Sequence, residues 1–79
     1  MPRFYTHVRQ GATLAKDREG IEFSSFASAR RRALLAINEM VAADFASGQR
    51  EIEFDVYIDD EAGVRVASLP IKAIITGLD

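Results

Sequence analysis

The chain contains no cysteine and no tryptophan, and its only histidine is His7. The absence of cysteine excludes disulfide bonds, thiolate metal sites and a cysteine nucleophile within the chain. A single histidine cannot form a multi-histidine metal site, and we expect no bound metal or cofactor. A chain of 79 residues is near the size at which one core is marginally stable. Oligomerisation is the stabilising device that these absences leave.

Long apolar runs are also missing, since none approaches the length of about eighteen residues that a membrane-spanning helix needs. The first residues have no apolar core of signal-peptide length. We therefore expect a cytoplasmic protein without a membrane partner. The net charge of -2 gives no overall attraction to nucleic acid. Residues 1–50 carry eight basic and five acidic side chains, and residues 51–79 carry two and seven. This asymmetry is typical of side-by-side hairpins that neutralise each other across strands.

Two Asp-x-x-Gly sequences, Asp17–Gly20 and Asp60–Gly63, have the residue chemistry of β-hairpin turns. Alternation of apolar and polar residues around them predicts two hairpins. The alternation is clearest in residues 51–59, which favours a central position for this strand. Pro70 places the end of its partner strand, residues 64–72, at an edge or a bulge.

Residues 26–47, between the two hairpins, predict one long helix. Ser25 is the expected N-cap, and Gly48 supplies the left-handed conformation that commonly ends a helix. An apolar stripe follows the helical period and comprises Phe26, Ala29, Ala33, Leu34, Ile37, Met40, Val41 and Phe45. We therefore predict a single domain, residues 1–79, of the α+β class. It would have an antiparallel sheet of about four strands, in ββαββ order, with the long helix on one face.

The chain opens Met-Pro-Arg-Phe-Tyr-Thr-His-Val-Arg-Gln-Gly and continues with an Asp-x-x-Gly turn, an alanine-rich charged helix and an acidic strand. This pattern resembles a family of small uncharacterised alphaproteobacterial proteins of the rhizobial type, which open Met-Pro-Arg-aromatic-aromatic-x-His-Val-Arg-x-Gly. The resemblance covers nearly the whole chain and implies the same architecture, with no assigned activity. A looser resemblance over residues 3–47 is to antitoxins of the HicB type, and it implies a toxin-neutralising role.

Tyr5, His7 and Arg9 have two-residue spacing, so their side chains stand in a row on one strand face. An aromatic side chain between basic ones is a platform for stacking a base or binding a phosphate. The structural alternative, which we favour, is an exposed sheet face with Tyr57 and Asp55 as cross-strand neighbours. In that alternative His7 pairs with a carboxylate.

Two further charged groups need interpretation. In the run Arg30-Arg31-Arg32, Arg31 and Arg32 face solvent on the predicted helix and either bind an acidic partner or phosphate, or pair with acidic residues of 51–61. The sequence Asp59-Asp60-Glu61 lacks the spacing of an EF-hand loop, so we interpret it as a turn with exposed carboxylates. No nucleophile elbow, phosphate-binding glycine loop or HExxH motif is present, and we assign no catalytic residue.

The end of the chain is apolar and contains Ile74, Ile75 and Leu78. We therefore predict a non-catalytic protein-interaction or regulatory module whose partner is a second copy of itself or an unidentified protein. The contact would be a sheet edge or this tail. The alternative is a nucleic-acid-binding module that uses Arg3, Tyr5, His7, Arg9 and the helix arginines. The third hypothesis is the HicB-like antitoxin.

Overall fold

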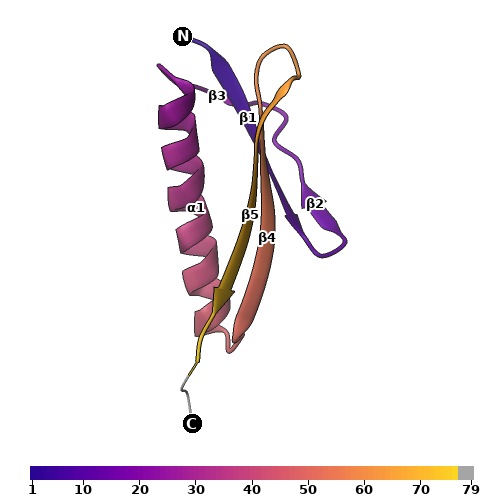
Figure 1. Ribbon diagram of the computed structural model, residues 1–79, viewed down its shortest axis with the longest axis vertical. Coiled ribbons are helices and arrows are strands. Elements are labelled where there is room, and N and C mark those ends of the chain that lie inside the picture. Colours follow the sequence, from indigo (N-terminus) through magenta and orange to yellow (C-terminus); the bar gives the residue numbers. More distant parts are fainter. Residues whose placement is uncertain (77–79) are drawn as a thin grey trace.

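The computed structural model describes residues 1–76, which form one helix and one antiparallel sheet. In chain order the elements are β1 (Arg3–Gln10), β2 (Thr13–Ala15), β3 (Ile21–Glu22), α1 (Phe26–Ala46), β4 (Glu51–Asp59) and β5 (Arg65–Ile74). The strands lie in the order β2-β1-β4-β5, and β3 also pairs with β1. α1 runs along one face of the sheet as a second layer (Figure 1). The predicted α+β architecture is confirmed, with β3 as an additional short strand.

β4 lies inside the sheet and carries half of the buried core. Its apolar residues Ile52, Phe54, Val56 and Ile58 are each 2% exposed or less and lie on the face that α1 covers. The alternate residues of β4 lie on the opposite face, which we call the outer face. A shift of one residue in the register would move the apolar row into water, so the alternation of β4 fixes the pairing with β1 and β5.

α1 begins at the predicted residue, Phe26, and ends at Ala46, one residue before the predicted end. The Ser25 hydroxyl accepts a hydrogen bond from the N–H of Ser28 at 3.2 Å, and Gly48 follows the helix with a φ of +103°. The fully buried helix residues are Ala29, Ala33 and Ile37, and α1 packs on β1 and β4. The predicted apolar stripe is wider than the buried one, because Phe26 and Met40 at its margins are each 37% exposed.

The Asp17–Gly20 sequence does not close a hairpin, so this part of the prediction was wrong. β2 and β3 both run antiparallel to β1, with Ala15 opposite Val8 and Ile21 opposite Phe4. Residues 16–20 bulge out between the two short strands. We call this segment the edge bulge. β2 and β3 therefore form one interrupted edge strand.

Asp60–Gly63 does close the hairpin of β4 and β5, as predicted. The carboxylate of Asp60 accepts hydrogen bonds from the N–H groups of Ala62 and Val64, both at 2.9 Å. β5 continues to Ile74, beyond the predicted end at residue 72. Pro70 therefore lies inside the strand rather than at its end.

Pro70 interrupts the free edge of β5. The N–H of Ile75 donates to the carbonyl of Arg50 at 2.9 Å, so these two residues form a hydrogen-bonded pair of the antiparallel ladder. Such pairs alternate along a ladder, which puts Pro70 and its opposite residue Asp55 in a non-hydrogen-bonded pair. The nitrogen of Pro70 thus points to the open edge, where it removes a donor that a further strand would need.

Gly20 is the tightest backbone position of the edge bulge. Its φ is +67°, and a Cβ there would lie 2.8 Å from Cε1 of Tyr5 and 2.9 Å from the carbonyl oxygen of Phe4. We expect Gly20→Ala to lower the free energy of unfolding by about 2–5 kcal/mol, because backbone strain adds to overpacking. Gly11→Ala is the matched control: its φ is +60°, and no atom lies within 4 Å of the added Cβ. This control should cost about 1–2 kcal/mol. Urea denaturation measures both losses, and equal values would contradict the packing role of Gly20.

Candidate functional site

Tyr5, His7 and Arg9 do stand in a row on the outer face, away from α1. The register of β1 and β4 places His7 opposite Tyr57 and Arg9 opposite Asp55. The predicted cross-strand neighbours are therefore confirmed. The strand register does not determine how deeply each side chain is buried, and the three side chains differ in their burial.

His7 is buried, with 5% of its surface exposed, so the expectation of a solvent-exposed face was wrong at this position. Its Nε2 lies 3.1 Å from Oδ2 of Asp59, and its Nδ1 accepts the N–H of Asp17 at 3.0 Å. A main-chain N–H can only donate, so Nδ1 carries no proton and Nε2–H donates to the carboxylate. The predicted pairing of His7 with a carboxylate is confirmed. The imidazole links β1 to the edge bulge and to the end of β4.

Asp17 occupies the gap that the edge bulge leaves in the ladder of β1. Its Oδ2 accepts the N–H of Thr6 at 3.2 Å, and its Oδ1 accepts the N–H groups of Glu19 and Gly20. Burial raises the pKa of the Asp17 carboxyl group, but the three backbone donors and His7 together outweigh it and hold the pKa below its ordinary value. The turn chemistry of Asp17 was visible in the sequence, whereas its role in the ladder was not.

Asp59 and Arg65 extend the network across the start of β5. The Nε of Arg65 donates to Oδ1 of Asp59 at 3.1 Å. This hydrogen bond is the main cause of the lowered pKa of Asp59; burial opposes it, and the charge of Arg65 and the contact with His7 add to it. The guanidinium carbon of Arg65 also lies 4.3 Å from the ring centroid of Tyr57. Sequence reasoning did not identify Asp59 or Arg65 as site residues.

Both tyrosines of this face have contacts within the fold. Arg65 covers the ring of Tyr57, and the ring edge of Tyr5 packs against Gly20. Base stacking needs a free aromatic face. One face of the Tyr57 ring is therefore not free for stacking, whereas the contact of Tyr5 involves only the ring edge.

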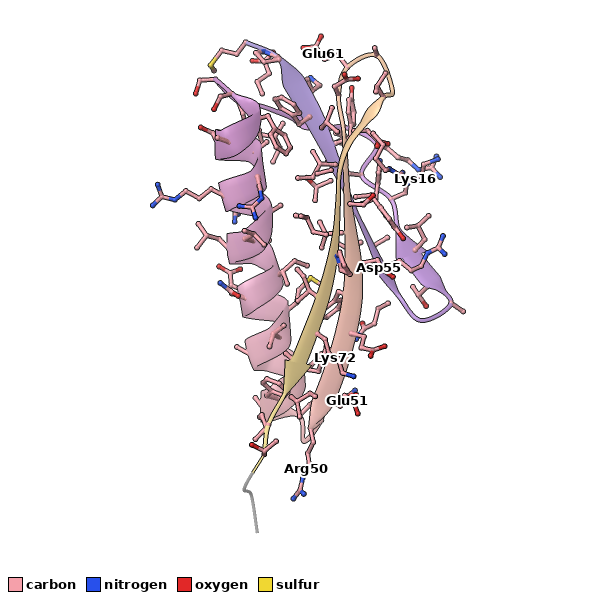
Figure 2. The ribbon with its side chains drawn as sticks, viewed as in Figure 1. Lys16, Arg50, Glu51, Asp55, Glu61 and Lys72 are labelled. Carbon is pink, nitrogen blue, oxygen red and sulfur yellow. The ribbon has the colours of Figure 1, made fainter. Side chains whose placement is uncertain are left out.

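A hollow of about 280 Å³ lies on the outer face, lined by His7, Tyr57 and Asp59 together with Leu14. Three cationic side chains also line it, and they come from separate segments: Arg9 from β1, Lys16 from the edge bulge and Arg65 from β5. Figure 2 shows Lys16 on the side of the sheet away from α1. We call this concavity the outer hollow. It combines a buried floor with converging positive charge.

The helix arginines lie elsewhere. Arg31 and Arg32 are exposed on α1, which covers the inner face, whereas Arg9 lies on the outer face. The structure therefore does not bring together the single basic surface that the nucleic-acid hypothesis combined.

The apolar residues of the predicted tail are also separated. Ile74 is 54% exposed on the outer face, opposite Glu51. Ile75 is half-buried, and by the alternation of the strand its side chain points to the inner face. Leu78 lies outside the described residues.

The predicted neutralisation between the two hairpins was wrong for three of the basic residues. Arg3 pairs with Glu22 at 3.5 Å, Lys72 pairs with Glu51 at 3.2 Å, and Arg65 pairs with Asp59, so each ion pair stays within its own half of the chain. His7 and Asp59 form a side-chain contact between the halves.

The acidic sequence at the tip of the second hairpin is bonded to protein groups. Asp59 binds His7 and Arg65, Asp60 caps its own loop, and Glu61 accepts the N–H of Arg3 at 2.6 Å. Figure 2 shows Glu61 near the end of the sheet where the chain begins. Residues 1–76 contain no group of three side chains that could hold a metal ion. Within the same residues, α1 is too polar to cross a membrane.

Removal of the imidazole tests its structural role. We expect His7→Ala to lower the free energy of unfolding by about 2–4 kcal/mol, because the N–H of Asp17 loses its acceptor and Asp59 loses a donor. Arg9→Ala, an exposed neighbour on the same face, should stay within about 0.5 kcal/mol of the wild type. Thermal and urea denaturation provide the comparison. An unchanged melting temperature for His7→Ala would instead support the hypothesis that His7 contacts a ligand.

The lowered pKa values of Asp17 and Asp59 make stability depend on pH. Both carboxylates protonate more readily in the unfolded chain, so their contribution is complete above the unfolded pKa of about 4 and is lost as the pH falls through the lower folded values. We expect Asp59→Asn to flatten the loss of stability below about pH 5. Asp55→Asn is the control, because its carboxylate forms no hydrogen bond or ion pair within residues 1–76. Identical pH profiles for wild type and Asp59→Asn would refute this assignment.

Comparison with known proteins identifies a family without identifying an activity. The family model described as "Domain of unknown function (DUF6894)" matches residues 3–72. No curated protein and no solved structure matches the chain significantly. The expected membership in an uncharacterised domain family is confirmed, while the rhizobial motif stays a prediction. Because the match spans nearly the whole chain, this protein belongs to the DUF6894 family.

Proposed function

We propose that this protein is a small non-catalytic interaction module that forms a homodimer through the inner face of β5. The supporting observation is a contrast between two neighbouring apolar rows. The inner residues of β4 are fully buried beneath α1. The inner residues of β5 and Ile75, which directly follows the strand, are only partly buried; this row comprises Ala67, Leu69, Ile71, Ala73 and Ile75. We call this set the β5 inner row.

The width of a helix explains the contrast. An α-helix with its side chains is about 10 Å across, and neighbouring strands are about 4.8 Å apart, so one helix covers about two strands. α1 packs on β1 and β4, the two inner strands of the sheet. The β5 inner row is left at the margin of the only helical layer in residues 1–76.

A second copy of the chain is the occupant that these features support. The fully buried apolar residues number eight in the described chain, a small core for an unaided domain. In a two-fold contact the same surface serves on both sides, so one partly covered row in each protomer is sufficient. Burial of apolar area contributes about 25 cal/mol per Å². A dimer would therefore strengthen the fold that it depends on.

The contact proposed is between faces and not between edges. Pro70 removes an outward donor from the edge of β5, and the edge bulge interrupts the opposite edge of the sheet. Neither edge offers the continuous row of donors and acceptors that strand addition requires. The HicB-like and nucleic-acid hypotheses stay predictions, and no contact described above favours either of them.

Ile74 and Ile75 provide a matched pair of variants, because adjacent residues of one strand point to opposite faces. We expect Ile75→Lys to dissociate the dimer and Ile74→Lys to leave it intact. Sedimentation equilibrium measures the mass. Thermal unfolding at several concentrations should show a melting temperature that depends on concentration only for wild type and Ile74→Lys.

Leu69→Gln is a second test, nearer the middle of the β5 inner row, and circular dichroism confirms that each variant is folded. A wild type that stays monomeric at high concentration would refute the proposal. Dissociation by Ile74→Lys with an intact Ile75→Lys dimer would place the contact on the outer face and would equally refute it.

A further inference from the structure

We infer that the outer hollow binds a phosphate group, either as the free anion or as a phosphomonoester. This site is independent of the proposed dimer, because the outer hollow and the β5 inner row lie on opposite faces of the sheet. The inference rests on unpaired charge, on the directions from which the cations approach, and on the fixed floor of the hollow.

The lining of the outer hollow carries excess positive charge. Asp59 already pairs with Arg65, so these two charges offset each other. Arg9 and Lys16 form no side-chain hydrogen bond or ion pair with any residue in the range 1–76. Asp55 faces Arg9 in the register, without an ion pair between them. Both ring nitrogens of His7 are already bonded, to Asp59 and to the N–H of Asp17. Two cations are therefore available to an anion in a concave site, where wall shape concentrates the field.

The arrangement of the cations favours a tetrahedral anion. Arg9, Lys16 and Arg65 reach the hollow from three different segments of the chain. The oxygens of a phosphate project in several directions and can accept hydrogen bonds from all three, whereas a carboxylate presents two oxygens in one plane. Because Arg65 covers Tyr57, the hollow recognises the phosphate without a stacked base.

The floor is fixed before any ligand arrives. Both nitrogens of His7 are bonded, and Arg65 is held by Asp59 and by the ring of Tyr57. Lys16 adjoins Asp17, whose carboxylate accepts three backbone hydrogen bonds. Groups that are already ordered lose less entropy on binding. The main ordering cost therefore falls on the side chains of Arg9 and Lys16.

The test is a titration of the ¹⁵N-labelled full chain with sodium phosphate and, separately, with phosphoserine, at an ionic strength kept constant with sodium chloride. We expect saturable shifts of amide signals around His7, Arg9 and Lys16. Arg9→Gln and Lys16→Gln should each weaken binding about tenfold or more, since each removes a charge-assisted hydrogen bond. Both residues are exposed, so unchanged melting temperatures would show that the variants are folded.

Lys72→Gln is the matched control, because Lys72 is an exposed lysine of the same face that pairs with Glu51 and Glu53. It should change the affinity by less than about twofold. Tighter binding of phosphoserine than of phosphate would assign the site to a phosphomonoester, and the reverse would assign it to the free anion. Absence of saturable shifts with both probes would overturn the inference. An equal loss in Lys72→Gln would also overturn it, by showing diffuse attraction only.

Discussion

The outer face of the sheet depends on the two hydrogen bonds that the imidazole of His7 forms. The edge bulge takes backbone partners away from β1, and an unsatisfied buried polar group costs about 1–3 kcal/mol. The carboxylate of Asp17 accepts the N–H of Thr6 in β1. The imidazole of His7 accepts the N–H of Asp17 in the edge bulge. The same ring orients Asp59, which in turn holds Arg65 over Tyr57. The buried side chain of His7 thus connects the edge bulge to the positions of Asp59, Arg65 and Tyr57 on the outer face.

The two edges of the sheet are protected by different means. On one side the strand is divided by the edge bulge, and on the other Pro70 removes a donor from the middle of β5. Long unprotected edges promote aggregation, and bulges and prolines are the usual remedies. Since both edges are interrupted, addition of a long continuous strand is disfavoured at either edge. The faces differ in kind: the inner one is apolar and incompletely covered by α1, and the outer one is charged.

Features encoded locally could be predicted from the sequence. The alternation in β4, the Ser25 cap and the Asp60–Gly63 turn each depend on residues that are close in the chain, and the structure has them where expected. The place of Asp17–Gly20 could not be predicted, because the same turn chemistry fits a hairpin or a bulge. Only the pairing of β2 and β3 with the same strand decides between them.

The candidate site was only partly predictable for a similar reason. Two-residue spacing correctly placed Tyr5, His7 and Arg9 on one face, but it does not show what covers that face. The burial of His7 comes from partners that are distant in sequence, Asp17 and Asp59. Ile74 and Ile75 do not form the single apolar tail that the sequence predicts, because adjacent residues of an extended segment point to opposite faces. A strand prediction that included Ile74 would have shown this separation.

Similar side chains have different roles here because their surroundings differ. Ion pairs with carboxylates offset the charges of three basic residues within the fold: Arg3, Arg65 and Lys72. Arg31 and Arg32 are exposed on α1, where successive side chains diverge, and Arg32 borders a separate hollow between α1 and β1. Arg9 and Lys16 are both unpaired and both line the outer hollow, and Arg9 also borders an adjacent hollow with Glu53 and Asp55. A fold does not by itself specify a function. The combination of an unneutralised charge with a converging geometry is what distinguishes these two residues from the other basic side chains on this protein.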